Sequence, residues 1–243
     1  MKTLLGRTTS REFREIFTEA RDAFGKPIKF LRLQELDTAD PFRRHKARMI
    51  VDESGARIYI QGSLPAGVSE TFAAHELSHL LLDSEGFPKA IWNNRLPPPR
   101  VEPSRKLATY IVNVLADPII AQRLEARGFP ALALLSQDVD VGLAILEQSG
   151  PVSQRDDQFD LGTFTYMNIR LTLSGEQVER YAGELKKKAR WMYLTGEEFV
   201  RIALDNGYET AEGNWRAAVD IFDRLPLQHV GLVAPGRQHA PRW

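Results

Sequence analysis

Near the start of the chain, hydrophobic residues recur at the spacing of one helix face: Phe13, Ile16, Phe17, Ala20 and Phe24. This pattern predicts an amphipathic helix. A Thr-x-x-Glu sequence that begins at Thr9 has the form of a capping box, which predicts where the helix begins. Gly25, followed by Pro27, predicts where it ends.

Three strands are predicted to follow this helix. Residues 27–33 alternate roughly between apolar and charged positions. Residues 47–51 and 56–61 flank the turn-forming sequence Asp-Glu-Ser-Gly, so we expect them to form a hairpin. Short strands beside helical segments predict an α+β fold with a small, mainly antiparallel sheet.

Residues 69–86 are predicted to form the next helix. Ser69 is a favourable N-cap residue, and Glu70 then lies in the first turn, where the helix dipole favours a negative charge. Gly86, followed by phenylalanine and proline, is typical of a helix end.

This segment contains the sequence His-Glu-Leu-Ser-His at residues 75–79. On a helix, His75 and His79 share one face with Cβ atoms roughly 5–6 Å apart, so both imidazoles can bind one metal ion. Glu76 is rotated by about 100° from His75 and can reach a water molecule on that metal. The pattern predicts the site of a zinc hydrolase. The alternative is two packed or solvated histidines beside an ordinary surface glutamate.

Residues 87–103 include three consecutive prolines and are predicted to form a long, extended connection. This connection either walls a substrate cleft or is an ordinary surface loop. From Pro103 onward a helix is expected that is apolar on nearly all sides and therefore buried. Along this helix, three polar residues spaced by four form a stripe: Thr109, Asn113 and Asp117.

A buried carboxylate needs polar partners or a metal ion, so Asp117 is predicted to be the third metal ligand. Asn113, one turn earlier, is expected to orient Asp117 through a hydrogen bond. The competing interpretation is that Asp117 and Pro118 are the N-cap and first residue of a new helix. Glu102 is the reserve candidate for the third ligand, although it sits beside a proline at the helix start.

Beyond Pro130 the chain is predicted to be helical throughout. Residues 158–173 are assigned to a helix, although a Thr-Phe-Thr-Tyr sequence within them can also alternate as a strand. Capping boxes at residues 174–177 and 195–198 predict two helix starts. The three lysines at residues 186–188 are predicted to be solvated. A last helix is predicted through Trp215, Val219 and Phe222. His229 and His239 are expected to be structural or exposed. His45, among basic residues, is expected at the surface.

Composition limits the possible partners and the chemistry. The 243 residues contain 32 basic and 32 acidic side chains, so neither nucleic acid nor an anionic membrane is expected to bind. The chain has no cysteine, so any metal must be held by histidine and carboxylate groups. No apolar run approaches the roughly 18 residues of a membrane-spanning helix, and the first residues do not resemble a signal peptide. A cytoplasmic protein is therefore expected.

The motif His75-Glu76-Leu77-Ser78-His79, followed by three leucines, resembles the active-site helix of the zincin metallopeptidases. It is most similar to the small intracellular ImmA/IrrE-like group, over roughly residues 28–129. The resemblance implies that the two histidines bind Zn²⁺, that Glu76 is the general base, and that a carboxylate on the next helix is the third ligand. That carboxylate is commonly a glutamate, so Asp117 departs from the usual pattern. The implied organisation is a minimal zincin-like core, residues 1–130, with a helical region, residues 131–243, packed on it.

The expected function is that of a zinc metallopeptidase that hydrolyses a peptide bond in a narrow intracellular protein substrate. The resemblance suggests a partner such as a repressor or an antitoxin. Two alternatives are a catalytically silent zincin scaffold that binds proteins, and a metal hydrolase of a non-peptide amide. The substrate oxyanion needs a further donor, for which four candidates stay open: Tyr166, Tyr181, Tyr193 and His229.

Overall fold

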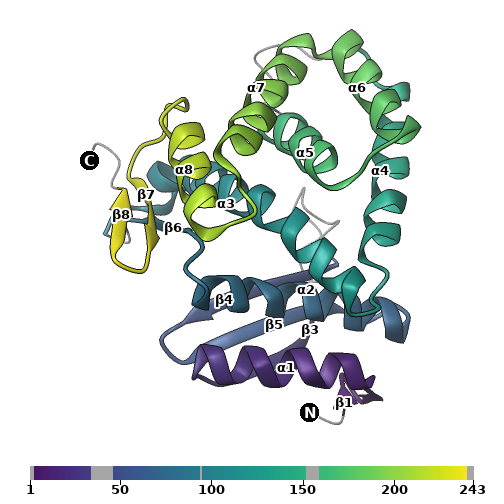
Figure 1. Ribbon diagram of the computed structural model, residues 1–243, viewed down its shortest axis with the longest axis vertical. Coiled ribbons are helices and arrows are strands. Elements are labelled where there is room, and N and C mark those ends of the chain that lie inside the picture. Colours follow the sequence, from purple (N-terminus) through teal and green to yellow (C-terminus); the bar gives the residue numbers. More distant parts are fainter. Residues whose placement is uncertain (1–2, 34–45, 94, 152–158, 240–243) are drawn as a thin grey trace. The chain divides into compact units, whose positions relative to one another are not determined.

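The computed structural model describes residues 3–33, 46–93, 95–151 and 159–239. Over these residues the fold is α+β and mostly helical, with eight helices and three small sheets (Figure 1). His45 lies outside the described residues. The chain divides into two compact units: unit 1 is Met1–Ser84 with Arg123–Ala131, and unit 2 is Glu85–Gln122 with Leu132–Trp243.

This division differs from the one predicted at residue 130. Strand β6 (Lys89–Trp92) and most of helix α3 (Pro98–Ala126) belong to unit 2, together with the C-terminal helices. The reason is pairing between segments remote in sequence, since β6 is antiparallel to β7 (Val230–Ala234). The last residues of α3 belong to unit 1, so this helix contributes to both units.

The sheet of unit 1 consists of β3 (Ile28–Leu33), β4 (Ala47–Asp52) and β5 (Gly55–Gln61), in the order β3-β5-β4. The three predicted strands are therefore confirmed. The sheet is mixed rather than mainly antiparallel, because β5 is antiparallel to β4 but parallel to β3. The turn sequence between β4 and β5 predicts that these two strands are antiparallel. The sequence around β3 contains no such signal, so it does not predict whether β3 is parallel or antiparallel to β5.

The hairpin turn between β4 and β5 is held by side chains and by a required glycine. The carboxylate of Asp52 accepts hydrogen bonds from the backbone N–H (2.8 Å) and the hydroxyl (2.6 Å) of Ser54. Gly55 has φ 140°, and a Cβ atom there would lie 2.2 Å from the carbonyl oxygen of Pro27. Any other residue at position 55 would therefore push β3 away from the turn.

A small hairpin, β1 (Thr3–Leu4) and β2 (Arg7–Thr8), precedes the first helix of unit 1, α1 (Arg11–Phe24). The N-cap of α1 is Ser10, whose hydroxyl accepts from the N–H of Phe13 (3.1 Å), so the helix starts one residue later than the capping box predicted. The core of unit 1 joins α1, the sheet and α2 (Ala66–Ser84) through fully buried side chains: Phe13, Ile16, Ile58, Ile60, Leu77 and Leu80.

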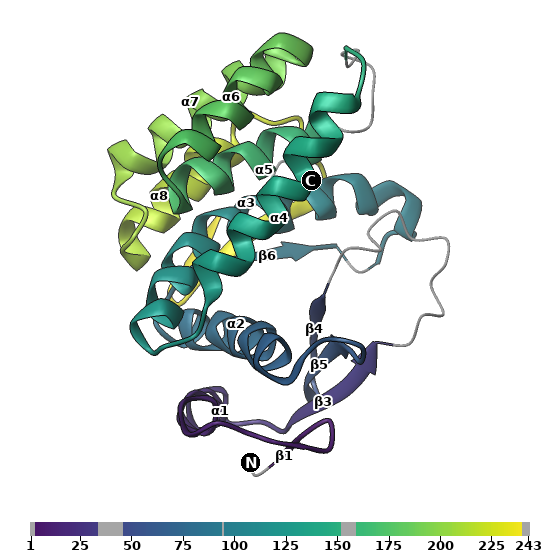
Figure 2. The same cartoon turned by 90° about the vertical axis from the view of Figure 1, so that its right-hand side faces the viewer.

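In unit 2, four helices lie side by side (Figures 1 and 2): α4 (Ala131–Gln148), α5 (Phe159–Thr172), α6 (Glu176–Lys188) and α7 (Arg190–Asn206). They share an apolar core that includes Leu143, Ile169, Leu185 and Met192. The predicted helices near residues 158–173 and 215–222 are confirmed, the latter as α8 (Ala211–Phe222).

Of the two helix starts predicted in unit 2, the one at residues 174–177 is confirmed by α6, although its N-cap is Gly175 and not Ser174, and the one at residues 195–198 is wrong. Helix α6 follows Gly175, which makes no side-chain cap hydrogen bond, and residues 195–198 lie inside α7. Both four-residue sequences have the residue types of a capping box. At residues 195–198, however, the helix is continuous on both sides, so no helix begins there.

The prediction that the chain is helical throughout after Pro130 is also wrong. Strands β7 and β8 (Arg237–His239) form an antiparallel sheet with β6, in the order β6-β7-β8. The long extended connection predicted for residues 87–103 is likewise replaced by β6 and by the start of α3 at Pro98. Proline is tolerated in the first turn of a helix because the N–H it lacks would have no partner there.

Lys188 was predicted to be solvated, but it caps the end of α4. Its Nζ donates hydrogen bonds to the carbonyl oxygens of Leu146 (2.6 Å), Glu147 (2.6 Å) and Ser149 (2.7 Å). The last carbonyls of a helix lack the N–H donors of a following turn, so a cation at this end stabilises them.

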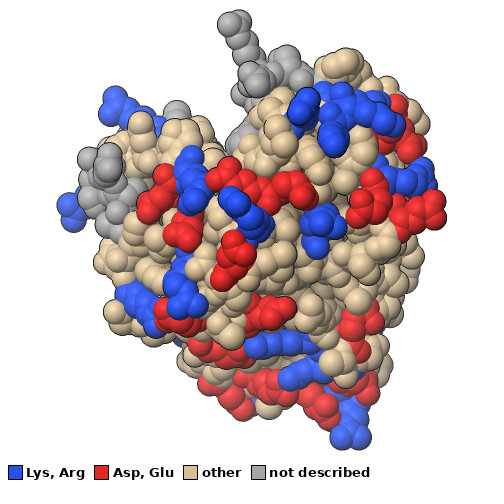
Figure 3. All heavy atoms as spheres, turned by 45° about the horizontal axis from the view of Figure 1, so that its top comes forward, with Lys and Arg blue, Asp and Glu red and all other residues tan. Residues whose placement is uncertain are grey.

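Basic and acidic side chains are interspersed over the face drawn in Figure 3, in keeping with the net charge of zero. Among the helices of the described residues, none combines the length and the apolar composition needed to cross a membrane.

Candidate metal centre

His75 and His79 lie one turn apart on α2, and their imidazole rings meet. The two Nε2 atoms are 3.2 Å apart, and the ring planes are inclined by 73°. Both side chains are half-buried. Leu77 and Leu80, fully buried on the same helix, fix the side of α2 that packs into the core of unit 1.

The separation of the two Nε2 atoms fits a shared metal ion. Zinc binds imidazole nitrogen at about 2.0–2.1 Å, so two such nitrogens at a tetrahedral angle lie about 3.3 Å apart. A hydrogen bond from a protonated Nε2 to an unprotonated one would span a similar distance, about 2.7–3.2 Å. The two arrangements differ in metal content, which is tested below.

Helix α2 begins earlier than its sequence predicted. Ser69 is not the N-cap, because the helix starts at Ala66 and the N–H of Ser69 already donates to the carbonyl of Pro65 (2.9 Å). Glu70 has a different role from the predicted one. Its buried carboxylate accepts the backbone N–H of Ser10 (3.0 and 3.3 Å), which ties the start of α1 to α2.

Glu76 follows His75 directly on α2 and is half-buried. The helix fixes the direction of its side chain relative to both imidazoles, since successive residues are rotated by about 100°. The backbone here is regular, and the buried hydroxyl of Ser78 donates to the carbonyl of Ala74 (2.8 Å) within the same helix. Glu76 is thus carried on a rigid element beside the two imidazoles.

Asp117 lies in unit 2, near the middle of α3, and is half-buried. The interpretation that Asp117 caps a new helix is wrong, because α3 continues through Pro118 to Ala126. The carboxylate of Asp117 instead accepts a hydrogen bond from the amide Nδ2 of Asn168, on α5, at 3.1 Å.

The turn of α3 before Asp117 is tied to α8. Pro118 has no N–H, so it leaves a helical carbonyl one turn earlier without its usual donor. In the same turn, the amide of Asn214 donates to the carbonyl of Leu115 (3.1 Å) and also to that of Tyr208 (2.9 Å). Asn214 is only 1% exposed, so these hydrogen bonds fix the backbone of α3 near Asp117 from within the core of unit 2.

Two contacts in the structure bear on the predicted surroundings of the third ligand. Asn168, rather than Asn113, supplies the described amide hydrogen bond to Asp117. Asn168 could not have been found from local sequence, because 51 residues separate it from Asp117. Glu102, the reserve ligand, forms a two-pronged ion pair with Arg105 on the same helix (2.6 and 2.7 Å), and this disfavours it as a ligand.

The strand directly before α2 has no free edge in its sheet. That strand, β5, is the centre of its sheet and is hydrogen-bonded on both sides, to β3 and to β4. The edge strands of this sheet are β3 and β4.

The tyrosines considered as oxyanion donors belong to the core of unit 2. Tyr166 is fully buried and donates a short hydrogen bond to Glu197, and burial holds the pKa of its hydroxyl far above the ordinary value. Burial also raises the pKa of Tyr181 to about 12. Tyr193 stacks beneath the ammonium group of Lys186. The hydroxyl of Tyr166 already donates its proton to Glu197, which disfavours this residue as the oxyanion donor.

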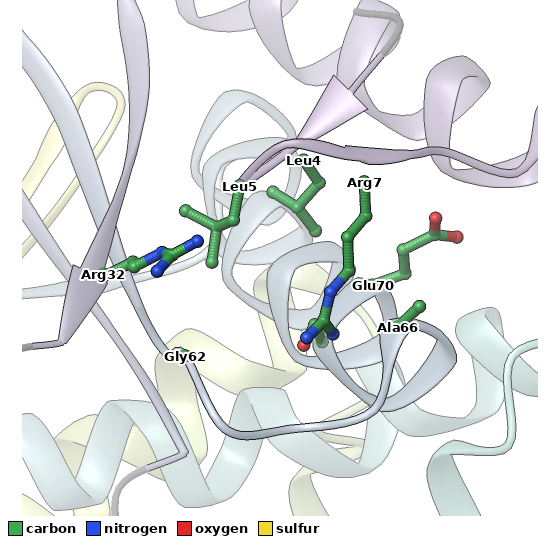
Figure 4. Close-up of a pocket in the computed structure, with 8 residues that line it drawn as sticks. Leu4, Leu5, Arg7, Arg32, Gly62, Ala66 and Glu70 are labelled. Atoms are coloured by element: carbon green, nitrogen blue, oxygen red, sulfur yellow. The ribbon is translucent and has the colours of Figure 1, made fainter.

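A small cavity lies at the N-terminal end of α2 in unit 1 (Figure 4). It is lined by the β1–β2 hairpin, by Arg32 and Gly62, and by the first turns of α2. Arg7 reaches across it to donate to the carbonyl of Leu64 (2.6 Å). Its volume of about 20 Å³ holds roughly one water molecule, so it is too small to be a peptide site.

No protein-family model, curated protein or solved structure matches this chain.

Proposed function

We propose that this protein is a zinc-dependent metallopeptidase in which His75, His79 and Asp117 hold one zinc ion. The observation that carries the proposal is the convergence of the two imidazoles on α2, whose Nε2 atoms lie 3.2 Å apart with Glu76 beside them. The order of elements supports it, since a helix, a small sheet, the motif helix and a further helix follow one another as the zincin resemblance implies.

The donor set fits a catalytic rather than a closed structural site. Two neutral imidazoles and one carboxylate are three protein ligands, and a catalytic zinc site keeps its fourth position open. A metal site of histidine and carboxylate groups is also the kind open to a chain without cysteine.

A zinc ion held by these residues would lower the pKa of a bound water to about 7 and polarise a substrate carbonyl. Glu76 would accept a proton from the attacking water as the new C–O bond forms. It would then deliver that proton to the leaving amine as the C–N bond breaks, so that one water is consumed and two peptide ends are released. A structural zinc site would have no use for this carboxylate.

The proposed substrate is a narrow set of intracellular proteins, as in the group that the motif resembles. An extended segment of such a protein can add to a sheet only at an edge, so β3 and β4, rather than the central strand β5, are the candidates for this role.

Comparison of the wild type with Glu76→Gln tests this function. Both zinc-loaded proteins are incubated with a library of peptides prepared from a denatured cell lysate, and new peptide ends are identified by mass spectrometry. We expect ends that depend on Glu76, while the variant keeps its fold and its zinc, because only the base is removed.

Glu53→Gln is the matched control, since this exposed residue lies in the β4–β5 turn and is expected to leave cleavage unchanged. Two results would overturn the assignment: equal cleavage by the wild type and Glu76→Gln, or loss of zinc from Glu76→Gln as complete as that from His79→Ala.

A further inference from the structure

We infer that Asn168 and Thr172, on α5, are positioning residues for Asp117. This inference rests on the proposed function, because it concerns a carboxylate that is proposed to bind zinc. It adds two residues of the C-terminal half to the candidate site, neither of which belongs to the motif or to the helix that follows it.

The first step is the contact with Asp117. The Nδ2 atom of Asn168 lies 3.1 Å from Oδ2 of Asp117, and both side chains are half-buried. A hydrogen bond to one carboxylate oxygen limits rotation of the carboxylate plane. Because Oδ2 carries this hydrogen bond, Oδ1 is the expected metal ligand. Partners of this kind orient metal ligands and tune their affinity.

The second step is the orientation of the Asn168 amide. Its two ends have opposite hydrogen-bonding character, and only the NH₂ end can donate to a carboxylate. Thr172, one turn later on α5, donates its hydroxyl to Oδ1 of Asn168 at 2.8 Å. This hydrogen bond stabilises the rotamer that directs Nδ2 toward Asp117. The chain of donors therefore runs from Thr172 to Asn168 and then to the proposed ligand.

The test measures zinc affinity by competition with a chelator, together with the unfolding midpoint of each metal-free protein. Asn168→Ala is expected to weaken zinc binding about 10- to 100-fold, as loss of a ligand-orienting partner does. Thr172→Val removes only the hydroxyl and is expected to give a smaller loss. Thr172→Ser keeps the hydroxyl and is expected to restore the wild-type affinity.

Thr163→Val is the matched control on the same helix. Thr163 is fully buried, and its hydroxyl has no hydrogen-bond partner among the described residues. The substitution makes the same chemical change as Thr172→Val but removes no donor to Asn168, so the zinc affinity should stay at the wild-type value. A purely structural role of α5 would lower the unfolding midpoint of the metal-free protein and leave the affinity unchanged.

A double-mutant cycle shows whether Asn168 acts through Asp117. In the Asp117→Ala background, Asn168→Ala is expected to have no further effect on zinc affinity. The inference is overturned if Asn168→Ala alone binds zinc as the wild type does. If that variant fails to fold, equal affinities of Thr172→Val and Thr172→Ser overturn it instead. If Asp117→Ala binds zinc as tightly as the wild type, then Asp117 is not the third ligand, and it is the proposed metal site that fails.

Discussion

The Nε2 atom of His75 lies 3.2 Å from that of His79, so one turn of α2 presents two imidazole nitrogens at the spacing of two ligands on one metal ion. Both rings can donate to a metal only in their neutral form. The arrangement is intrinsic to unit 1, because both residues belong to one helix.

The purified protein is expected to contain about one zinc ion per chain, since these two nitrogens supply half of a tetrahedral site. His75→Ala and His79→Ala should each lose it, as measured by elemental analysis. His239→Ala is the control, because its ring is paired with Asp223 (2.9 Å), and it should keep its zinc. A wild-type protein that contains no metal, and that zinc does not stabilise, would contradict the proposal.

Asp117→Ala is expected to lower zinc affinity by orders of magnitude, because it removes a charged ligand. Glu102→Ala should change that affinity little. It loses a partly exposed ion pair with Arg105, worth about 0–1 kcal/mol of stability. A zinc titration of both variants decides between the two carboxylates, and full affinity in Asp117→Ala would transfer the ligand role to Glu102.

Lys188→Met should destabilise the protein by about 1–2 kcal/mol, because it removes a charged donor from three carbonyl oxygens near the end of α4. Lys187→Met, one residue earlier in the chain, is the matched control substitution. Lys187 pairs only with Glu184 on its own helix among its described contacts, and its loss should cost less than about 0.5 kcal/mol. Denaturant unfolding measures both, and equal effects would show that the cap adds no stability.

A fragment that ends at residue 130 is not expected to fold. It keeps α3 but removes β7 and Asn214, and the apolar residues Ile111, Leu115 and Ile120 of α3 are fully buried in the whole chain. Without the C-terminal helices these side chains would face water, at a cost of about 1.5–3 kcal/mol each. Size-exclusion chromatography and thermal unfolding check this prediction, and a soluble fragment with a cooperative transition would refute it.

The sequence by itself determined the features that depend on near neighbours. The apolar spacing after Phe13 specifies α1, and the Asp52 turn specifies the β4–β5 hairpin. The spacing of His75 and His79 is also local, since a helix brings residues four apart onto one face. For this reason the imidazole pair and Glu76 could be named before the structure was known.

Tertiary structure alone decided which remote segments meet. The pairing of β6 with β7, the placement of Lys188 at the end of α4, and the hydrogen bond from Asn168 to Asp117 each join residues at least 39 positions apart. Amide, ammonium and carbonyl groups can pair with many partners, so residue type does not identify the one that is used. Helix boundaries at Ala66 and Pro98 were missed for a related reason. Packing and backbone hydrogen bonds outweighed the weak local preference of Ser69 for a cap and of consecutive prolines for an extended chain.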